Sequence, residues 1–149
     1  ILNLNVGEQI SPKIIEENIG ISKDFNIFEF QNALGKKDIL KSNRIIKHFS
    51  ENPKNHPFVL TISNIFSFFQ KIMIYHNLKD KSKGNVSAIL GINPFFVHSY
   101  QTAAKNYSMS KLYKIFTLLK EYDLKSKGVN NPSLNDSELL RELTFKILH

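Results

Sequence analysis

The chain has 149 residues, which is the length of one domain or of one domain and part of a second. Hydrophobic residues make up 42% and charged residues 22%, which excludes a disordered chain, a collagen-like chain and a coiled-coil rod. There is no cysteine, so disulfide frameworks, zinc ribbons, iron–sulfur clusters and thiol catalysis are excluded together. The net charge is +7, but only Arg44 and Arg141 among the 20 basic residues are arginines. Because Arg is preferred for bidentate contacts to phosphate and guanine, this balance favours a lysine-rich solubilising surface over sequence readout.

The chain begins at Ile1 without an initiator methionine and without a signal-peptide pattern, so we expect it to be a fragment of a longer protein. Residues Ile1 to Val6 would then be the end of a helix that starts upstream. The most apolar stretch, Phe58 to Tyr75, contains six polar residues, so the sequence predicts no membrane span.

Glycine, proline and capping residues divide the first half of the chain into helices. The first is predicted from Ser11-Pro12 to Gly20, the second from Asn26 to Gly35, and the third begins at Asp38. A break rich in turn residues at Asn52–Pro57 precedes a long helix from about Pro57 to Leu78. This long helix is apolar over more than half its circumference and carries Phe58, Ile62, Ile65, Phe66, Phe69, Ile72, Met73 and Tyr75.

The second half begins with a charged loop, Lys79–Gly84, followed by a short helix that Gly91 ends. Asn93-Pro94 caps a helix to about Asn106, and Ser110 is the predicted cap of a long helix to Lys127. Asp136 or Ser137 caps the last predicted helix. Its apolar residues are Leu139, Leu140, Leu143, Ile147 and Leu148.

No segment has a convincing strand pattern, so the sequence predicts an all-α fold. Residues 1–56 carry eight basic and seven acidic side chains, a net charge of +1, whereas residues 57–149 carry 12 and six, a net charge of +6. This asymmetry and the Asn52–Pro57 break predict two units with few contacts between them that move somewhat independently.

The sequence contains no recognisable catalytic site. There is no phosphate-binding glycine loop and no serine nucleophile elbow, and no two of the five histidines are four residues apart as a metal pair would require. Glu16-Glu17 is the only adjacent acidic pair, and His98 is expected to be a partly buried packing residue. The sequence therefore predicts no catalytic residue, no cofactor and no metal.

A helix-turn-helix reader of DNA is the alternative interpretation, placed at residues 85–106. The second helix of that segment begins with Phe95, Phe96 and Val97, where a DNA reader needs polar side chains. Bulky apolar groups at those positions are expected to be buried against the protein core instead. Weak, non-specific binding to duplex DNA is expected, mainly through the Lys79–Lys83 loop.

An interaction module is the third interpretation, because a domain of about 90 residues has limited interior for so apolar a long helix. The candidate residues are either subunit-interface or packing residues, and the sequence leaves both readings open: Phe58, Ile62, Ile65, Phe66, Phe69, Ile72, Met73, Leu140 and Leu143. Asp123 and Lys127 are four residues apart on one helix and form a candidate structural ion pair.

Four segments, in order, resemble the C-terminal part of the delta subunit of bacterial DNA polymerase III, in the forms found in Bacteroidetes. They are residues 19–34, with Phe28-Glu29-Phe30; residues 90–97, Leu90-Gly91-Ile92-Asn93-Pro94-Phe95-Phe96-Val97; residues 103–112; and residues 118–128, Leu118-Leu119-Lys120-Glu121-Tyr122-Asp123 with Lys127-Gly128. Leu90, Gly91, Pro94, Phe95 and Phe96 are the residues of the second segment that match the family motif.

The resemblance implies a cytoplasmic, replisome-associated scaffold with no cofactor. Residues 1–56 would be the C-terminal part of a helical lid domain, and residues 57–149 a collar domain that packs with those of the gamma/tau and delta-prime subunits in the clamp loader. Binding to the sliding clamp belongs to an N-terminal domain that these residues do not include. The parent subunit is grouped with DNA-directed DNA polymerase through the holoenzyme, although nothing in these residues could transfer a nucleotide.

Overall fold

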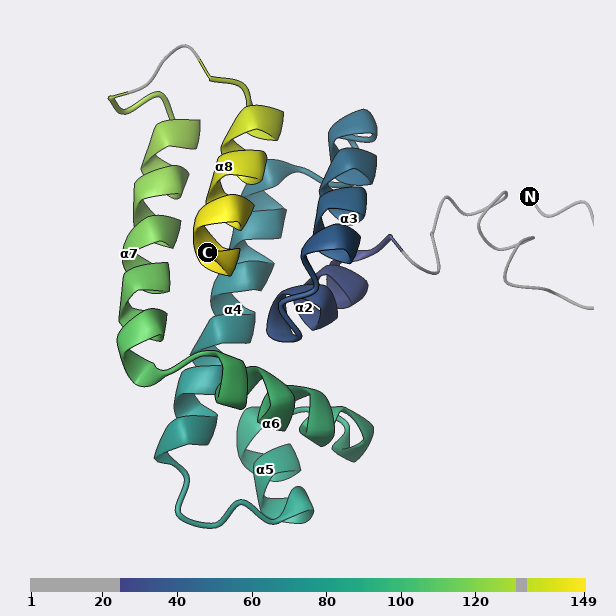
Figure 1. Cartoon of the computed structure of the whole chain (residues 1–149), viewed down its shortest axis with the longest axis vertical. Coiled ribbons are helices and arrows are strands. Elements are labelled where there is room, and N and C mark those ends of the chain that lie inside the picture. Colours follow the sequence, from purple (N-terminus) through teal and green to yellow (C-terminus); the bar gives the residue numbers. More distant parts are fainter. Residues whose placement is uncertain (1–24, 131–133) are drawn as a thin grey trace, which may run out of the picture.

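The computed structural model describes residues 25–130 and 134–149, and these residues form α-helices and one short 3₁₀ turn with no strand among them (Figure 1). The all-α prediction is confirmed. The predicted helix at 11–20 and the segment Ile1–Val6 lie outside the described residues. The elements are α2 (Ile27–Gly35), α3 (Ile39–Glu51), α4 (Phe58–Asn77), α5 (Lys83–Leu90), η1 (Pro94–Phe96), α6 (Val97–Asn106), α7 (Met109–Ser126) and α8 (Asp136–Leu148).

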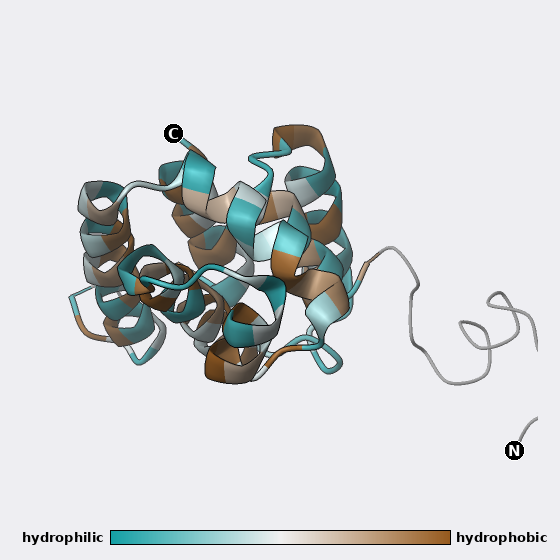
Figure 2. Ribbon diagram, turned by 90° about the horizontal axis from the view of Figure 1, so that it is seen from below, coloured by the Kyte–Doolittle hydropathy of each residue, from teal (hydrophilic) through white to brown (hydrophobic). Residues whose placement is uncertain are grey.

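Helix α4 lies at the centre of the bundle and contacts α2, α5, α6, α7 and α8. Helix α8 runs between α3 and α7 and packs against both, while α5 and α6 lie at the opposite end of the molecule from the end of α7 and the start of α8 (Figure 1). The helices alternate apolar and polar segments along their length, the pattern of elements that bury one face (Figure 2). Their buried side chains form one continuous hydrophobic core.

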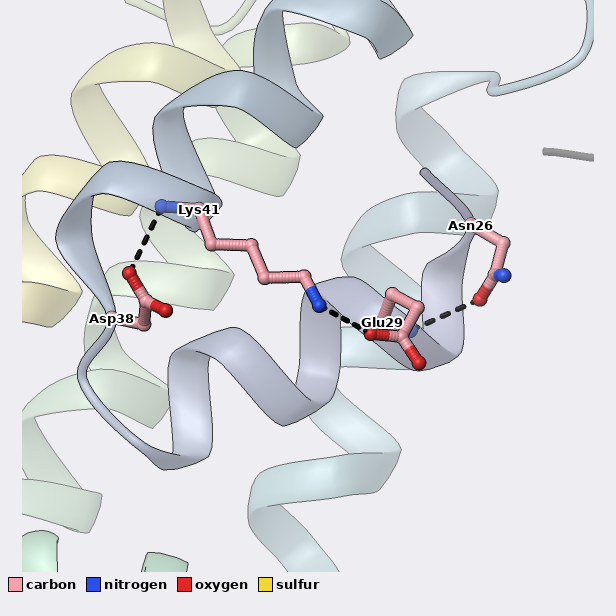
Figure 3. A network of polar contacts seen from close by, with 4 residues as sticks. All are labelled: Asn26, Glu29, Asp38 and Lys41. Carbon is pink, nitrogen blue, oxygen red and sulfur yellow. Dashed lines mark hydrogen bonds and ion pairs between the residues drawn. The ribbon is translucent and has the colours of Figure 1, made fainter. Parts of the chain in front are cut away.

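The starts of α2 and α3 are fixed by predicted capping residues (Figure 3). The Asn26 side chain accepts a hydrogen bond from the backbone N–H of Glu29 at 3.0 Å, and the Asp38 carboxylate accepts one from the backbone N–H of Lys41 at 3.0 Å. The Lys41 ammonium then pairs with the Glu29 carboxylate at 2.6 Å. The ion pair thus joins the start of α2 to the start of α3, in addition to the short loop that connects the end of α2 to α3.

Two predicted caps are wrong by one or two residues. Helix α7 begins at Met109, and its cap is Ser108 rather than Ser110. Helix α8 is capped by Asn135 rather than by Asp136 or Ser137, because Asn135 forms a capping box with Glu138 in which each side chain bonds to the other residue's backbone N–H. The two reciprocal hydrogen bonds satisfy two backbone N–H groups at the start of the helix. A cap at Asp136 or Ser137 would have no Glu or Gln three residues later to form the second bond.

Most of the apolar residues singled out on the long helix are packing residues. Phe58, Ile62, Ile65, Phe69 and Ile72 of α4 are buried, as are Leu140 and Leu143 of α8. Met73 is half-buried and packs against the core, and Phe66 is 45% exposed. By length and composition alone, α4 could cross a membrane, but 44% of its apolar window is buried inside this fold, as in the central helix of a helical bundle.

The two parts of the chain share one core, so the prediction of few contacts across Asn52–Pro57 is wrong for the described residues. Helix α2 packs on α4 and α6, and α3 packs on α8. The buried Tyr107 hydroxyl donates a hydrogen bond to the Leu34 carbonyl at 2.6 Å, and the Asn106 amide donates one to the Gly35 carbonyl at 2.8 Å. These hydrogen bonds join residues more than 70 positions apart, so the Gly, Pro and capping residues that mark helix ends could not reveal them. The assignment of residues 1–56 to a lid domain stays a prediction.

Candidate subunit interface

The motif segment 90–97 forms a tight corner between α5 and α6. Leu90 is buried, and Gly91 takes the left-handed conformation at φ +63° that ends α5, as glycine does readily. The Asn93 side chain accepts a hydrogen bond from the backbone N–H of Phe95 at 2.9 Å, so it caps the turn that Pro94 begins. The predicted Gly91 stop and Asn93-Pro94 start are both confirmed.

The corner presents two phenylalanines to solvent. Phe95 is 81% exposed and Phe96 is 49% exposed, and their rings meet edge to face with centroids 5.5 Å apart. The expectation that both are buried is wrong. The segment Pro94–Phe96 is a 3₁₀ turn, which winds more tightly than an α-helix, and only the next residue, Val97, reaches the core.

Phe28 of α2 completes an apolar rim opposite this corner. Its side chain is 72% exposed, and it lines a groove with Phe95 and Phe96. The groove has a volume of about 450 Å³ and lies between α2, α4, η1 and α6. We call it the phenylalanine groove, and its lining residues are Phe28, Glu29, Gln31, Asn32, Asn64, Ser67, Phe68, Lys71, Gly91, Ile92, Asn93, Phe95, Phe96, Ser99 and Tyr100.

The inner wall of the phenylalanine groove combines buried rings with polar groups. The buried rings of Phe68 and Tyr100 are 5.4 Å apart, and the Gln31 amide donates a hydrogen bond to the Asn64 carbonyl at 3.1 Å, which joins α2 to α4. Lys71 forms no ion pair among the described residues, whereas Glu29 is held by Lys41. The groove therefore offers apolar anchors, fixed amide groups and one unpaired cation to a binding partner.

Phe28 is not among the candidate residues predicted from the sequence, although the helical period separates it from the buried face of α2. Phe30 and Leu34 are four residues apart and are both fully buried. Phe28 precedes Phe30 by two positions, about 200° around the helix, so it must point the other way. Strict use of the helical period would have separated this residue from the core.

Other large apolar side chains are exposed on α4, α7 and α8. On α4 they are Val59, Leu60, Phe66 and Ile74; on α7, Tyr113 and Leu124; on α8, Phe145. Phe66 contacts Phe116 of α7 edge to face at 5.4 Å, so it already has a neighbour. Within the described residues, these side chains are spread along their helices, while Phe28, Phe95 and Phe96 converge on one groove.

Asp123 and Lys127 form the predicted ion pair, with 2.8 Å between the Asp123 carboxylate and the Lys127 ammonium. A second pair of the same spacing joins Glu121 to Lys125 at 2.8 Å, and that hydrogen bond lowers the pKa of the Glu121 carboxyl. Both pairs lie along α7 and contribute a few tenths of a kcal/mol each to the helix. They do not reach a neighbouring helix.

The histidines do not gather into a metal site. No group of three or more His, Cys, Asp or Glu among the described residues could hold a metal ion. His98 is exposed rather than partly buried. His56 instead stacks on the buried ring of Phe49 at 3.9 Å and meets His48 at 5.6 Å. Burial, followed by repulsion from His48, lowers the pKa of the His56 imidazole. The three rings form a packing cluster between the end of α3 and the start of α4.

The described residues form an all-helical domain with one core and an apolar groove at its surface. A comparison with protein families matches residues 24–144 to the DNA polymerase III delta subunit, C-terminal domain, and the chain belongs to this family. The match includes the motif segment 90–97 and both sides of the phenylalanine groove. No curated protein and no solved structure matches the chain.

Proposed function

We propose that this chain is a non-catalytic scaffold of the DNA polymerase III clamp loader, whose helical domain packs against the corresponding domains of the gamma/tau and delta-prime subunits. The family match over residues 24–144 carries the proposal. In this role the domain helps to hold the assembly together while the sliding clamp is loaded during DNA replication. Contact with the clamp itself would require residues outside this chain.

The phenylalanine groove is the proposed contact surface. An exposed phenylalanine gains most from association when a partner removes it from water, and aromatic residues are enriched where interfaces are most strongly bound. Phe28, Phe95 and Phe96 are three such residues around a single hollow. Two of them, Phe95 and Phe96, belong to a segment that resembles the delta family, and all three lie within the residues that match the family.

Helix α4 supports the proposal in a second way. The buried side chains of α4 form the domain's own core, so they are available to no partner. The interface must therefore use exposed positions, and a stable one needs at least about 1,000 Å² of well-fitted contact. The groove with its rim supplies the apolar centre of such a surface.

Reconstitution with purified gamma/tau and delta-prime subunits tests the proposal. Phe95→Asp and Phe28→Asp each place a charge on the rim, and each is expected to weaken assembly by about 2 kcal/mol or more, roughly 30-fold, as measured by analytical ultracentrifugation. Phe145→Asp is the matched control, because it changes an exposed phenylalanine of α8 that does not line the groove. Circular dichroism should show the same helical content in all three variants.

The variants distinguish an error in the proposed contact surface from an error in the proposed function. Loss of assembly in Phe145→Asp, but not in Phe95→Asp, would move the interface to α8. If Phe28→Asp, Phe95→Asp, Phe66→Asp and Phe145→Asp all leave assembly unchanged, the scaffold function of this domain is wrong.

A further inference from the structure

Helix α8 presents a second surface, on its outward side between α3 and α7. Arg141, Phe145 and His149 follow one another at four-residue spacing and are all exposed. Hollows lie on both sides of this row, and Phe145 lines both of them. We call this surface the α8 face. Its other lining residues are Lys111, Lys114, Thr117, Leu118 and Lys146 toward α7, and Asn43, Ile46, Lys47 and Ser50 toward α3.

The α8 face is strongly cationic. Arg141 and Lys47 line the hollow toward α3, and Lys111 and Lys114 line the hollow toward α7, while no Asp or Glu side chain of the described residues lines either one. None of these four cations forms an ion pair with another described residue. A set of like charges without internal partners attracts anions from solution.

Glu142 and Lys146, two charged residues that flank this row on α8, interact with Tyr122 of α7. The Glu142 carboxylate accepts a hydrogen bond from the Tyr122 hydroxyl at 2.9 Å, and the Lys146 ammonium lies 5.2 Å from the centre of the Tyr122 ring. Both groups are therefore directed to Tyr122 of α7. The Lys146 ammonium is not counted among the cations that would meet a ligand on the α8 face.

Positive charge is crowded where α7 begins and α8 ends. The Lys111 ammonium lies 3.4 Å from the Lys146 carbonyl in the last turn of α8. Partial burial, and then repulsion from Lys37 and Lys114, lowers the pKa of the Lys111 ammonium. A bound anion would relieve this repulsion, so the cluster is better suited to a negatively charged partner than to bulk water.

Phe145 adds a flat apolar surface to the middle of this charge. Its ring is 63% exposed and lies 4.5 Å from the His149 ring. Duplex DNA presents phosphates but keeps its bases stacked, so it would leave an exposed ring unused. A single strand offers phosphates and unstacked bases together, and base stacking on aromatic side chains is a common mode of single-strand binding.

We propose that the α8 face binds single-stranded nucleic acid, with Phe145 stacking on a base while Lys47, Arg141, Lys111 and Lys114 contact the flanking phosphates. This site is separate from the phenylalanine groove. It also differs from the Lys79–Lys83 loop predicted from the sequence. In that loop Asp80 lies among the lysines, and the Lys81 ammonium is bonded to the Leu78 carbonyl at 3.0 Å.

Fluorescence anisotropy with the 149-residue chain and a labelled oligo(dT) tests this site. Four phosphate contacts on a single strand predict a slope of about −3 for the logarithm of the association constant against the logarithm of salt concentration. The double variant Lys47→Gln/Arg141→Gln should make the slope shallower by about 1.4. Lys79→Gln/Lys83→Gln removes the same number of charges from the exposed loop and should change the slope less.

Phe145→Ala distinguishes stacking from charge. It should weaken binding to oligo(dT) by about fivefold or more, and leave binding to an abasic strand of the same length unchanged. Tyr113→Ala removes a similarly exposed ring that lines neither hollow, and it should have no effect on either strand. The salt slope should be the same in Phe145→Ala as in the unchanged chain, because no charge is lost.

Three results would overturn the proposal. Equal losses on oligo(dT) and the abasic strand would show that Phe145 does not stack on bases. Duplex DNA binding as tightly as the single strand would show that unstacked bases contribute nothing. Equal binding to a poly-glutamate peptide would identify the partner as an acidic protein segment instead.

Discussion

Tyr107→Phe is a direct test of the contact between residues 25–56 and the rest of the domain. The Tyr107 side chain is fully buried, its ring meets Phe69 edge to face at 5.1 Å, and its hydroxyl donates to the Leu34 carbonyl at 2.6 Å. The substitution keeps the ring and removes only the hydroxyl. It therefore measures a bond that crosses between the two parts of the chain.

The expected loss is about 1 kcal/mol in the free energy of unfolding. A net contribution of roughly 0.5–1.5 kcal/mol is typical of a protein hydrogen bond, and leaving a buried group unsatisfied costs more. Here the Leu34 carbonyl keeps a second hydrogen bond, from the backbone N–H of Lys37 at 3.0 Å. The loss therefore stays near the middle of that range, which lowers the melting temperature by roughly 3–5 °C.

Urea unfolding followed by far-ultraviolet circular dichroism measures this loss, with Tyr113→Phe as the control. Tyr113 is 61% exposed, so removing its hydroxyl should leave stability unchanged. The unfolding curve of Tyr107→Phe should remain a single transition with an unchanged slope, because α2 and α3 share the core of the other helices. An unchanged midpoint, or a separate early transition from α2 and α3, would refute the reasoning.

Three further predictions concern pH and the helix ends. Burial raises the pKa of Tyr107 above its ordinary value of 10.0, so the stability that this neutral side chain contributes is fully present below pH 10 and decreases as the pH rises above it. In a pH series of thermal melts, Tyr107→Phe should therefore lose less stability above pH 10 than the unchanged chain does. Asn135→Ala should cost about 1 kcal/mol in urea unfolding, whereas Ser137→Ala, at the alternative cap, should change stability little. Lys127→Gln breaks the exposed pair with Asp123 and should cost less than about 0.5 kcal/mol, with no measurable difference at high salt.

The helices themselves could be predicted because their signals are local. Asn26 and Asp38 cap α2 and α3, and Gly91 ends α5 at a positive φ, each as the sequence indicates. Where two or three possible capping residues lie close together, as Ser108 and Ser110 do, the sequence does not show which of them begins the helix. The choice then depends on which side chain reaches a free N–H once the neighbouring helices are packed.

The candidate groove could be predicted only in part. The motif 90–97 marked its corner, but the exposure of Phe95 and Phe96 follows from a 3₁₀ turn that an α-helical period does not describe. The opposite rim depends on α2 packing against α6, a contact between segments about 70 residues apart. Hydrophobic periodicity shows which face of a helix is buried, and it does not show which other helix covers that face.

The contact between α3 and α8 has a consequence for how the chain folds as it is made. Ile45 and Phe49 of α3 are buried in the finished domain, yet α8 begins about 90 residues later. At roughly 5–20 residues per second, the ribosome needs several seconds or more to add the missing helix. During that interval α3 lacks one of its packing partners, so the nascent chain exposes apolar surface until synthesis reaches α8. Completion of the core is therefore a late event of translation, and a chain that stops before α8 would leave α3 open to aggregation or proteolysis.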